Sequence, residues 1–377
     1  MATDNKNKVL NVPHLRFPEF SGEWEKCKFG DIATGFDYGM NAAAKSFDGE
    51  NKYIRITDID EASSTYGEKD MVSPDGILSD NYLVKDRDIL LARTGASTGK
   101  SYLYKKSDGK LYYAGFLIRA NVTKHNPYFV FSQLHTHRYW RWVSIMSARS
   151  GQPGINSLEY SSFPIFTTSL HEENKISSLL YLLDERIATQ NKIIEKLQSL
   201  IKGLAAQLTQ SGTPNVRLCD CLECHSSTLQ ENCVSATGSY PVYGAIGLIG
   251  YTNSYAYNGE SILIVKDGSG VGSLSYVNDH FSVIGTLNYL TAKEKHSILY
   301  LYYALMAFNF TPYITGMAIP HIYFKDYGKA KLFCPSFEKQ KEFALLLHKI
   351  EQKLVTEQNL ITALSAQKSF LLHMLFI

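Results

Sequence analysis

Two long stripes of apolar residues constrain the fold of this chain more than any other feature. Within each stripe the apolar positions follow one another at alternating steps of four and three residues, and the second stripe lies 167 positions after the first. Such steps average 3.5 residues, which is the coiled-coil period, and each run exceeds four heptads. An ordinary core helix rarely keeps so narrow a seam over this length. The sequence therefore predicts two long helices that bury their seams against each other.

Three polar residues interrupt the two seams. The first seam consists of Ile176, Leu180, Leu183, Ile187, Gln190, Ile194, Leu197, Ile201, Leu204 and Leu208, and the second of Phe343, Leu347, Ile350, Leu354, Glu357, Ile361, Leu364, Lys368, Leu371 and Leu375. Gln190 and Glu357 hold the same position in the two seams. Polar seam residues lower stability but fix the register of the helices. If the helices run antiparallel, we expect Gln190 and Glu357 to lie together near the middle of the pair.

Local signals mark the ends of these helices. Ser169 followed by Glu172 is a capping-box pattern, and Ser336 repeats the cap with Lys339 in place of the glutamate. Gly212, just after the first apolar stripe, is typical of a helix end.

A shorter repeat precedes each helix. The stretch "DILLARTGASTGKSYLY" from Asp88 resembles "SILIVKDGSGVGSLSYV" from Ser261, at an offset of 173 positions. In each copy a short apolar strand leads into a basic residue, then a glycine-rich loop and a second strand that contains tyrosine. The matching residues are Ile89 and Ile262, Arg93 and Lys266, Gly95 and Gly268, and Gly99 and Gly272. Further along, "RSGQPGIN" (149–156) is matched with "ITGMAIPH" (314–321).

The chain is thus predicted to alternate a globular region with a long helix, twice. We expect the boundaries at 1–168, 169–210, 211–335 and 336–377. Each globular region mixes short strands, glycine-rich turns and a few helices, such as one over 126–146. The predicted fold class is α+β, with two similar globular α/β regions separated by two long antiparallel coiled-coil helices in a pseudo-twofold internal repeat.

Length, composition and charge limit the classes of protein to which this chain could belong. The 377 residues, 45% of them hydrophobic, suffice for two domains with sizeable cores. The net charge of +2 means that local patches must meet any anionic partner. No apolar run approaches the roughly 20 residues that cross a bilayer, and the polar N-terminus has no apolar signal core. We therefore expect a cytoplasmic protein without a membrane partner and with reduced thiols.

The stretch "LCDCLECH" raises the question of a zinc site. It holds Cys219, Cys221, Cys224 and His225, with Cys233 nearby. Structural zinc sites usually combine a Cys-x-x-Cys knuckle with a distant second pair of ligands. We favour buried thiols on strands over a metal site.

The loop "ARTGASTGK" raises the question of a nucleotide site. A P-loop needs four residues between its glycines and a helix after its lysine. Here only three residues separate Gly95 and Gly99, "SYLYKK" alternates like a strand, and the second copy has no lysine. A nucleotide hydrolase that uses Lys100 stays a minor alternative. A nuclease carboxylate cluster, a His-Glu-x-x-His zinc helix and a Gly-x-Ser-x-Gly elbow do not stand out. The sequence favours a non-catalytic binding component without a cofactor.

Two copies of a loop at a fixed separation suit a double-stranded DNA partner. Helices of about 38 residues span roughly 57 Å, or about 17 base pairs. Arg and Lys recognise guanine, Asn and Gln recognise adenine, and hydroxyls hold phosphates. The candidate DNA-binding residues are Arg93, Thr94, Ser97, Lys100, Arg149, Gln152 and Asn156 in the first region and Lys266, Ser269 and His321 in the second.

Two stretches carry a resemblance to a known family. "LRFPEFSGEWEKCKFGDI" (15–32) is similar to the opening of the specificity subunits of type I restriction–modification systems. "GMAIPHIYFKDYGKAKLFCPSFEKQ" (316–340) is similar to the stretch that leads into their second conserved helix. The alternation of globular regions and helices extends the resemblance over essentially the whole chain.

The resemblance implies a function and partners. Each globular region would be a target-recognition domain that reads one half of a split DNA site, and the helices would form the antiparallel spacer. Two methyltransferase subunits, which carry S-adenosylmethionine, would dock on the assembly, and motor-nuclease subunits would join for cleavage. This chain would itself be non-catalytic and hold no cofactor or metal. A coiled-coil scaffold that does not touch nucleic acid is the other alternative.

Overall fold

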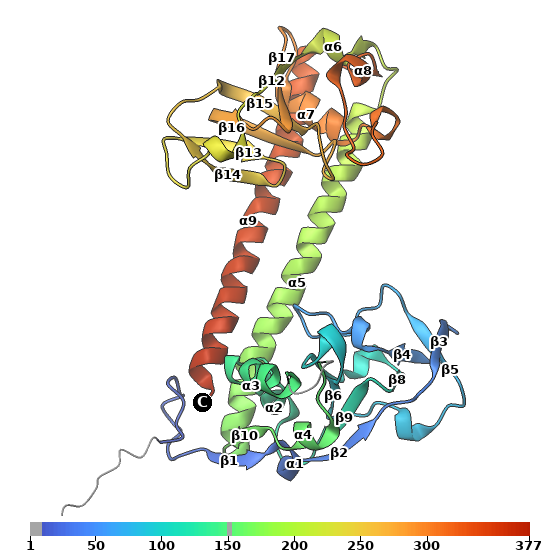
Figure 1. Ribbon diagram of the computed structural model, residues 1–377, viewed down its shortest axis with the longest axis vertical. Helices are drawn as coiled ribbons and strands as arrows, with labels where there is room; N and C mark the ends of the chain where they lie inside the picture. The colour runs from blue at the N-terminus through green and yellow to red at the C-terminus, as the bar shows by residue number, and fades with distance from the viewer. Residues whose placement is uncertain (1–9, 149–152) are drawn as a thin grey trace, which may run out of the picture. The chain divides into compact units, whose positions relative to one another are not determined.

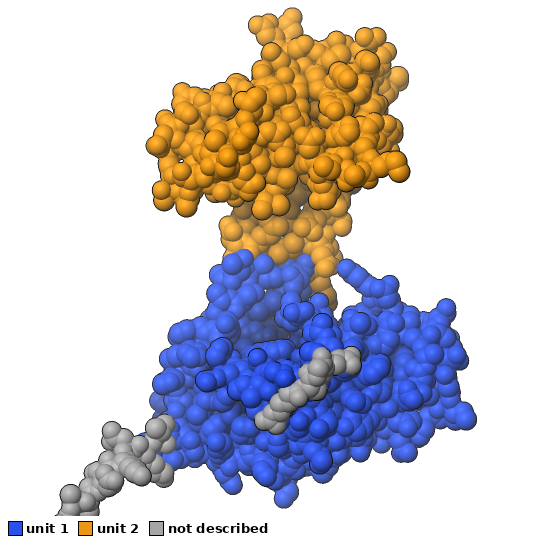
Figure 2. All heavy atoms as spheres, in the orientation of Figure 1, with its two compact units in different colours: residues 1–191, 360–377 blue, residues 192–359 orange. Residues whose placement is uncertain are grey.

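The computed structural model describes residues 10–148 and 153–377. They belong to two compact units, which Figure 2 distinguishes by colour. Unit 1 comprises residues 1–191 and 360–377, and unit 2 comprises residues 192–359. Each unit therefore contains one globular region and one end of both long helices. Each unit contains part of both long helices, whereas the four segments expected from the sequence keep each helix whole. The boundaries of those four segments stay a prediction.

The two long helices are α5 (Leu170–Thr209) and α9 (Phe337–Leu375), labelled in Figure 1. Every seam position predicted from the sequence is buried or half-buried. In unit 1, Ile176 and Leu180 of α5 share an apolar cluster with Leu375 at the end of α9. In unit 2, Ala205 near the end of α5 shares a cluster with Leu347 near the start of α9. The helices thus run antiparallel within each unit, which confirms the predicted pairing.

The polar seam residues are buried or paired. Gln190 is 5% exposed and Glu357 is 7% exposed, and Glu357 forms an ion pair with Lys353. In unit 1 the Lys368 ammonium lies 2.6 Å from the Asp184 carboxylate. The expected proximity of Gln190 and Glu357 stays a prediction, because these residues belong to different units.

Unit 1 is built on a four-stranded sheet with the strand order β2-β9-β6-β7. Three two-stranded pairs accompany it, namely β1-β10, β3-β5 and the parallel pair β4-β8. The strands are β1 (Glu25–Lys28), β2 (Ala33–Tyr38), β3 (Ala43–Ser46), β4 (Lys52–Ile54), β5 (Val72–Asp75), β6 (Asp88–Ala92), β7 (Ser101–Leu103), β8 (Leu111–Tyr113), β9 (Leu117–Val122) and β10 (Pro164–Thr167). The short helices are α1 (Phe29–Ile32), α2 (Pro127–Gln133), α3 (His137–Ser147) and α4 (Ser157–Ser161).

Unit 2 is built on a six-stranded sheet with the order β12-β17-β15-β16-β13-β14. All neighbours in it are antiparallel except β13 and β16. The strands are β11 (Val216–Arg217), β12 (Leu222–Ser226), β13 (Tyr240–Gly244), β14 (Gly247–Thr252), β15 (Tyr257–Val265), β16 (Leu274–Val283), β17 (Leu287–Ala292) and β18 (Lys331–Leu332). The short helices are α6 (Leu218–Cys221), α7 (Ile298–Met306) and α8 (Phe324–Tyr327).

The two sheets share one plan. The order β2-β9-β6-β7 in unit 1 recurs as β12-β17-β15-β16 in unit 2, and the pair β1-β10 recurs as β11-β18. Successive residues of a strand point to opposite faces. Ile89 of β6 and Ile262 of β15 accordingly pack against the short helices, whereas Leu90 and Leu263 pack into a second cluster on the other face. The repeat read from the sequence is therefore a repeat of topology and of core.

A buried side chain of each long helix anchors the globular region. In unit 1, Glu173 of α5 accepts hydrogen bonds from the Asn126 amide (2.9 Å) and lies 2.8 Å from the His125 Nδ1. In unit 2, Gln340 of α9 accepts one from the Ser297 amide (3.0 Å). Asn126 and Ser297 are the N-caps of α2 and α7. These contacts fix the short helix of each region to its long helix.

Several local expectations need correction. The predicted helix over 126–146 is two helices, α2 and α3, because Thr136 caps a new start. Ser169 does cap α5 through the Glu172 amide at 3.3 Å. The Glu172 carboxylate, however, binds Arg16 and Thr168, so the capping box is not completed. None of the helices in the described part of the chain combines the length and apolar character that a bilayer crossing requires.

Candidate nucleic-acid interface

In unit 1 the two candidate loops lie side by side. The glycine-rich loop follows β6, and the Gly95 amide donates to the Pro153 carbonyl at 3.1 Å. The Ile155 amide donates back to the Arg93 carbonyl at 2.9 Å, and Thr94 forms an antiparallel bridge with Gly154. Backbone hydrogen bonds therefore join the loop after β6 to the segment that precedes α4.

Unit 2 repeats this arrangement bond for bond. The Gly268 amide donates to the Pro320 carbonyl at 2.9 Å, and the Ile322 amide donates to the Lys266 carbonyl at 2.9 Å. Asp267 bridges His321 as Thr94 bridges Gly154. We call each pair of joined loops a loop platform, comprising residues 93–100 and 153–156 in unit 1 and residues 266–273 and 320–323 in unit 2.

The glycines of the repeat are required by backbone geometry. Gly95 and Gly99 have φ of +68° and +92°, and Gly268 and Gly272 have φ of +96° and +86°. Residues with a Cβ rarely adopt this left-handed region. Around Gly99 the space is also full, because an added Cβ would lie 2.8 Å from a methyl of Val143. The identical glycine spacing thus accompanies the same left-handed conformation at both glycines of each loop.

The hydrogen bonds correct the match between the second loops. The sequence comparison paired 149–156 with 314–321, whereas the bonds pair Pro153 with Pro320 and Ile155 with Ile322. The segment 153–156 therefore corresponds to 320–323, and the counterpart of Asn156 is Tyr323 rather than His321. Two candidate residues, Arg149 and Gln152, lie outside the described residues.

Arg93 is held at the edge of the unit 1 platform. Its amide donates to the Phe116 carbonyl (3.0 Å), and its guanidinium lies over the Tyr38 ring, 4.6 Å from the centroid. Hydrogen bonding from Ser157, helped by the charge of Arg93, lowers the pKa of Tyr38. A guanidinium stacked on one face of a ring keeps N–H donors at its edge for a further partner.

Two other polar residues of the unit 1 platform, Lys100 and Asn156, already have partners within the protein. The Lys100 ammonium lies 3.1 Å from the Glu61 carboxylate and is 19% exposed. The Asn156 Oδ1 accepts from the Glu159 amide at 2.9 Å and so caps α4. Thr94 and Ser97 are half-buried. Among the described residues, Arg93 is therefore the cation of this platform that forms no ion pair, and Asn156 has a structural role that sequence reasoning missed.

The unit 2 platform presents a different set of side chains. Lys266 is half-buried, and its amide donates to the Thr286 carbonyl (3.0 Å), as Arg93 does to Phe116. Ser269 is exposed at the loop. The His321 ring contacts the exposed Tyr323 ring edge-on, with 5.0 Å between centroids. Lys325 in turn lies 5.0 Å from the Tyr323 centroid.

Sequence reasoning missed several exposed residues at the platforms. They are aromatic or apolar, namely Tyr38 and Phe116 in unit 1 and Met317, Ile319 and Tyr323 in unit 2. The missed signal was the position of Phe116 just after the glycine of "YAGFLIR" and of Tyr323 at the corrected register. A search for hydrogen-bonding side chains alone does not find these residues.

The loop of unit 1 is not a P-loop. Strand β7, rather than a helix, follows Lys100, and the Gly99 carbonyl accepts a hydrogen bond from the buried Tyr139 hydroxyl (2.8 Å). A phosphate cradle needs free amides at a helix N-terminus. Here the Gly95 and Gly99 amides already bind Pro153 and Ala92. The alternative of a nucleotide hydrolase therefore has no structural support.

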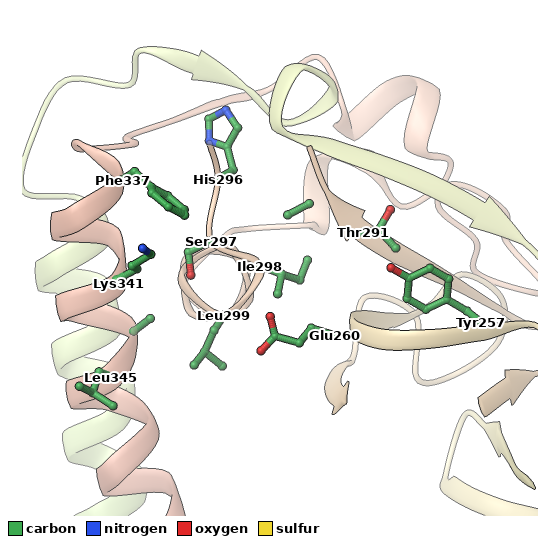
Figure 3. Close-up of a pocket in the computed structure, with 12 residues that line it drawn as sticks. Tyr257, Glu260, Thr291, His296, Ser297, Ile298, Leu299, Phe337, Lys341 and Leu345 are labelled. Atoms are coloured by element: carbon green, nitrogen blue, oxygen red, sulfur yellow. The ribbon is translucent and has the colours of Figure 1, made fainter. Parts of the chain in front are cut away.

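A cavity of about 610 Å³ in unit 2 lies between α9 and the start of α7 (Figure 3). Phe337, Lys341 and Leu345 of α9 face it on one side. Two of its polar groups already form hydrogen bonds within the protein. The Ser297 hydroxyl caps α7, and the Glu260 carboxylate accepts a hydrogen bond from the Tyr276 hydroxyl at 2.6 Å. A serine nucleophile needs a base within hydrogen-bond reach. Among the described residues, the buried His296 Nδ1 has no hydrogen-bond partner, so it does not activate Ser297.

The cysteines of unit 2 lie partly on a helix. Cys219 and Cys221 belong to α6, so the expected strand location is wrong for them, whereas Cys224 does lie on β12. Cys221 is buried and hydrogen-bonds Cys334, which together with burial raises the pKa of Cys221. Burial raises the pKa of Cys224 to about 11. Metal ligation needs thiolates, and no three potential ligands gather among the described residues.

Comparison with known proteins links this geometry to one family. The family model for the type I restriction modification DNA specificity domain matches residues 21–199 and 215–366. The chain is 28% identical over 130 residues to the specificity subunit of the type I restriction enzyme EcoprrI from Escherichia coli. This match covers 34% of the chain and 31% of the relative's length.

Solved structures share the fold. The S subunit of a type I restriction–modification system from M. genitalium matches 97% of this chain and 99% of its own with a TM-score of 0.69 and 16% identity. A chain from a study of complex assembly and conformational transition of the type I system matches 94% of this chain and 97% of its own, with a TM-score of 0.52 and 14% identity. At such identities these likenesses concern the fold.

Proposed function

Because this chain belongs to the family of type I restriction–modification DNA specificity proteins, we propose that it is the sequence-specificity subunit of such a system. Each globular region reads one half of a bipartite site in double-stranded DNA. The repeated loop platform carries the proposal, since the same backbone bonds join Gly95 to Pro153 and Gly268 to Pro320 in regions with different side chains. A constant backbone arrangement that carries different side chains would let the two regions recognise two different DNA half-sites.

The proposed reading residues are those of the two platforms. In unit 1 they are Arg93, Thr94, Ser97 and Lys100, with Asn156 next to them. In unit 2 they are Lys266, Ser269 and His321, with Tyr323 as an addition from the corrected register. Arg93 is the strongest candidate for a base edge, because its guanidinium already has an ordered position over Tyr38.

The long helices serve as spacer and docking surface in this proposal. Their antiparallel pairing in each unit supports a rigid element that sets the distance between half-sites. Several large apolar residues outside the seams are exposed, among them Leu182, Leu200 and Leu345. Exposed apolar surface of this kind marks protein interfaces. We assign it to two methyltransferase subunits, which carry S-adenosylmethionine, and we expect motor-nuclease subunits to join them for cleavage.

The chain itself takes no catalytic part in this proposal. The catalytic chemistry, with its cofactor, belongs to the partner subunits, and this chain contributes geometry. A cytoplasmic location follows from a DNA partner. The segments 1–168 and 211–335 are the proposed target-recognition domains, and 169–210 and 336–377 are the proposed spacer helices.

Methylome sequencing of cells with and without this gene tests the proposal. We expect a split DNA motif whose methylation disappears on deletion. Replacing residues 24–165 by the region of another family member should change one half of that motif and leave the other half and the gap unchanged. A scaffold that does not touch DNA predicts no change of motif, which would contradict the proposal.

A further inference from the structure

A closed hairpin leads into the second loop of the unit 2 platform. The Thr315 amide donates to the His321 carbonyl at 2.9 Å, and the His321 amide donates to the Thr315 carbonyl at 2.8 Å. Gly316 starts the turn with φ of +91°, and an added Cβ there would lie 2.3 Å from the Ile319 carbonyl oxygen. These constraints give residues 316–320 a defined conformation.

The tip of this hairpin is apolar and points into solvent. Met317 is fully exposed, Ala318 is exposed and Ile319 is 65% exposed. Apolar side chains gathered on a tip without a covering element mark an interaction surface. A turn whose only task is to reverse the chain is ordinarily polar.

The tip is attached to the proposed reading loop. Pro320 accepts the hydrogen bond from Gly268, and His321 bridges Asp267, so the hairpin emerges directly beside Lys266 and Ser269. Tyr323 and Lys325 follow on the same segment, with the ammonium over the ring. Apolar and hydrogen-bonding side chains thus form one surface around the platform.

We propose that Met317 and Ile319 read thymine C5-methyl groups in the half-site bound by unit 2, an inference that rests on the proposed function. On the edges of base pairs in the major groove, this methyl group is the one apolar feature, and the remaining features are donors and acceptors. An apolar tip beside a hydrogen-bonding loop therefore has a specific partner there. Methionine suits the contact because its unbranched, polarizable side chain adapts to a small apolar target.

A thermodynamic cycle between protein and DNA tests this contact. The full specificity subunit, assembled with its methyltransferase subunits, is titrated with duplexes that carry its methylome-defined site. In a second set, each thymine of the unit 2 half-site is replaced in turn by deoxyuridine, which removes one methyl group. We expect the unaltered complex to bind about fourfold more weakly at one or two of these positions, since that is the effect of one buried methyl group.

The protein side of the cycle uses two matched variants. Met317→Ala should bind the thymine duplex more weakly, by about four- to tenfold, and lose the response to deoxyuridine. Ile246→Ala is the control, because Ile246 is 94% exposed on the turn between β13 and β14 of the same unit. It should keep both the affinity and the response. Met317→Leu retains an apolar tip and should restore most of the affinity.

Four results would overturn the proposal. The first is a deoxyuridine response that persists in Met317→Ala, and the second is a half-site without thymine. The third is a loss of methyltransferase subunits from the variant complex. The fourth is a rise in 2-aminopurine fluorescence with no response to deoxyuridine. The third would make the tip a protein-docking element, and the fourth would place it between stacked bases. An unaltered complex that binds no split site would instead contradict the proposed function, so the two failures are distinguishable.

Discussion

Arg93 and Lys100 are the two cations of the unit 1 loop, and their surroundings differ. The Arg93 guanidinium stacks on Tyr38, whereas the Lys100 ammonium is paired with Glu61 at 3.1 Å. A carboxylate partner neutralises a cation and must be displaced before a phosphate can bind. Position in the loop alone therefore does not decide which cation reaches DNA.

Arg93→Ala should weaken specific DNA binding by about 1–3 kcal/mol if the guanidinium reads a base edge. Lys100→Ala, the matched change in the same loop, should have a smaller effect because of Glu61. Titrations of the assembled complex at several salt concentrations measure both. A phosphate contact would instead lower affinity for all sequences alike and flatten the salt dependence. Equal losses for the two variants would contradict the distinction drawn here.

His135 gives unit 1 a predicted sensitivity to acid. Burial, with the nearby charge of Lys368, lowers the pKa of His135 to about 4, and its ring nitrogens lie 2.9 Å from the Phe131 carbonyl and the Ser64 hydroxyl. The unfolded chain binds a proton near pH 6.5, whereas the folded chain does so only near pH 4. Stability contributed by the neutral ring is therefore present above pH 6.5 and falls as the pH drops toward 4.

Replacing His135 by Gln removes this titration. Between pH 7 and pH 5, the unaltered protein should lose about 1–2 kcal/mol more stability than His135→Gln, a value reduced for the half-buried ring. Urea unfolding followed by tryptophan fluorescence measures it, because Trp24, Trp140 and Trp142 are the three tryptophans and all belong to unit 1. Parallel losses in both proteins would exclude His135 as the cause.

Among the elements, the glycine-rich loop is held by its surroundings as well as by its own backbone. The Gly99 amide binds Ala92, its carbonyl binds the Tyr139 hydroxyl, and its Cα faces Val143 of α3. Gly95, at the other end of the loop, has no atom within 4 Å of the position that a Cβ would take. A side chain at Gly95 would therefore cause backbone strain alone, whereas one at Gly99 would cause both backbone strain and overpacking.

Gly99→Ala should destabilise unit 1 by about 2–4 kcal/mol, because it adds overpacking to a left-handed backbone conformation. Gly95→Ala should cost about 1–2 kcal/mol, since it adds the backbone strain alone. Urea unfolding with the same tryptophan signal compares the two. If Gly95→Ala proved the more destabilising, the packing of Gly99 against α3 would not be what fixes the loop.

Some features of the helices, strands and loops could be predicted from the sequence, and others could not. The seams and the strand–loop–strand repeat were predictable, because helical period, glycine geometry and strand alternation are local properties. The register of the second loops was missed by two residues, since the tip from Gly316 to Ile319 has no local pattern that fixes it. The anchors Glu173 and Gln340 depend on partners about 45 positions away. The structural use of Asn156 as a helix cap depends on where α4 starts.

At the scale of the whole molecule, the proposed function requires the helices to set the gap between half-sites. Inserting four residues after Asn191, within α5, adds about 6 Å, which corresponds to about two base pairs. A coiled coil accommodates such an insertion as a stutter that locally unwinds the pair. The methylome of cells with the longer chain should therefore show the same two half-sites with a wider gap. The control is the same insertion at Ile246, in the turn between β13 and β14, which should leave the gap as it was. A gap unchanged by the insertion in α5 would mean that something other than helix length sets it, and the spacer role would have to be abandoned.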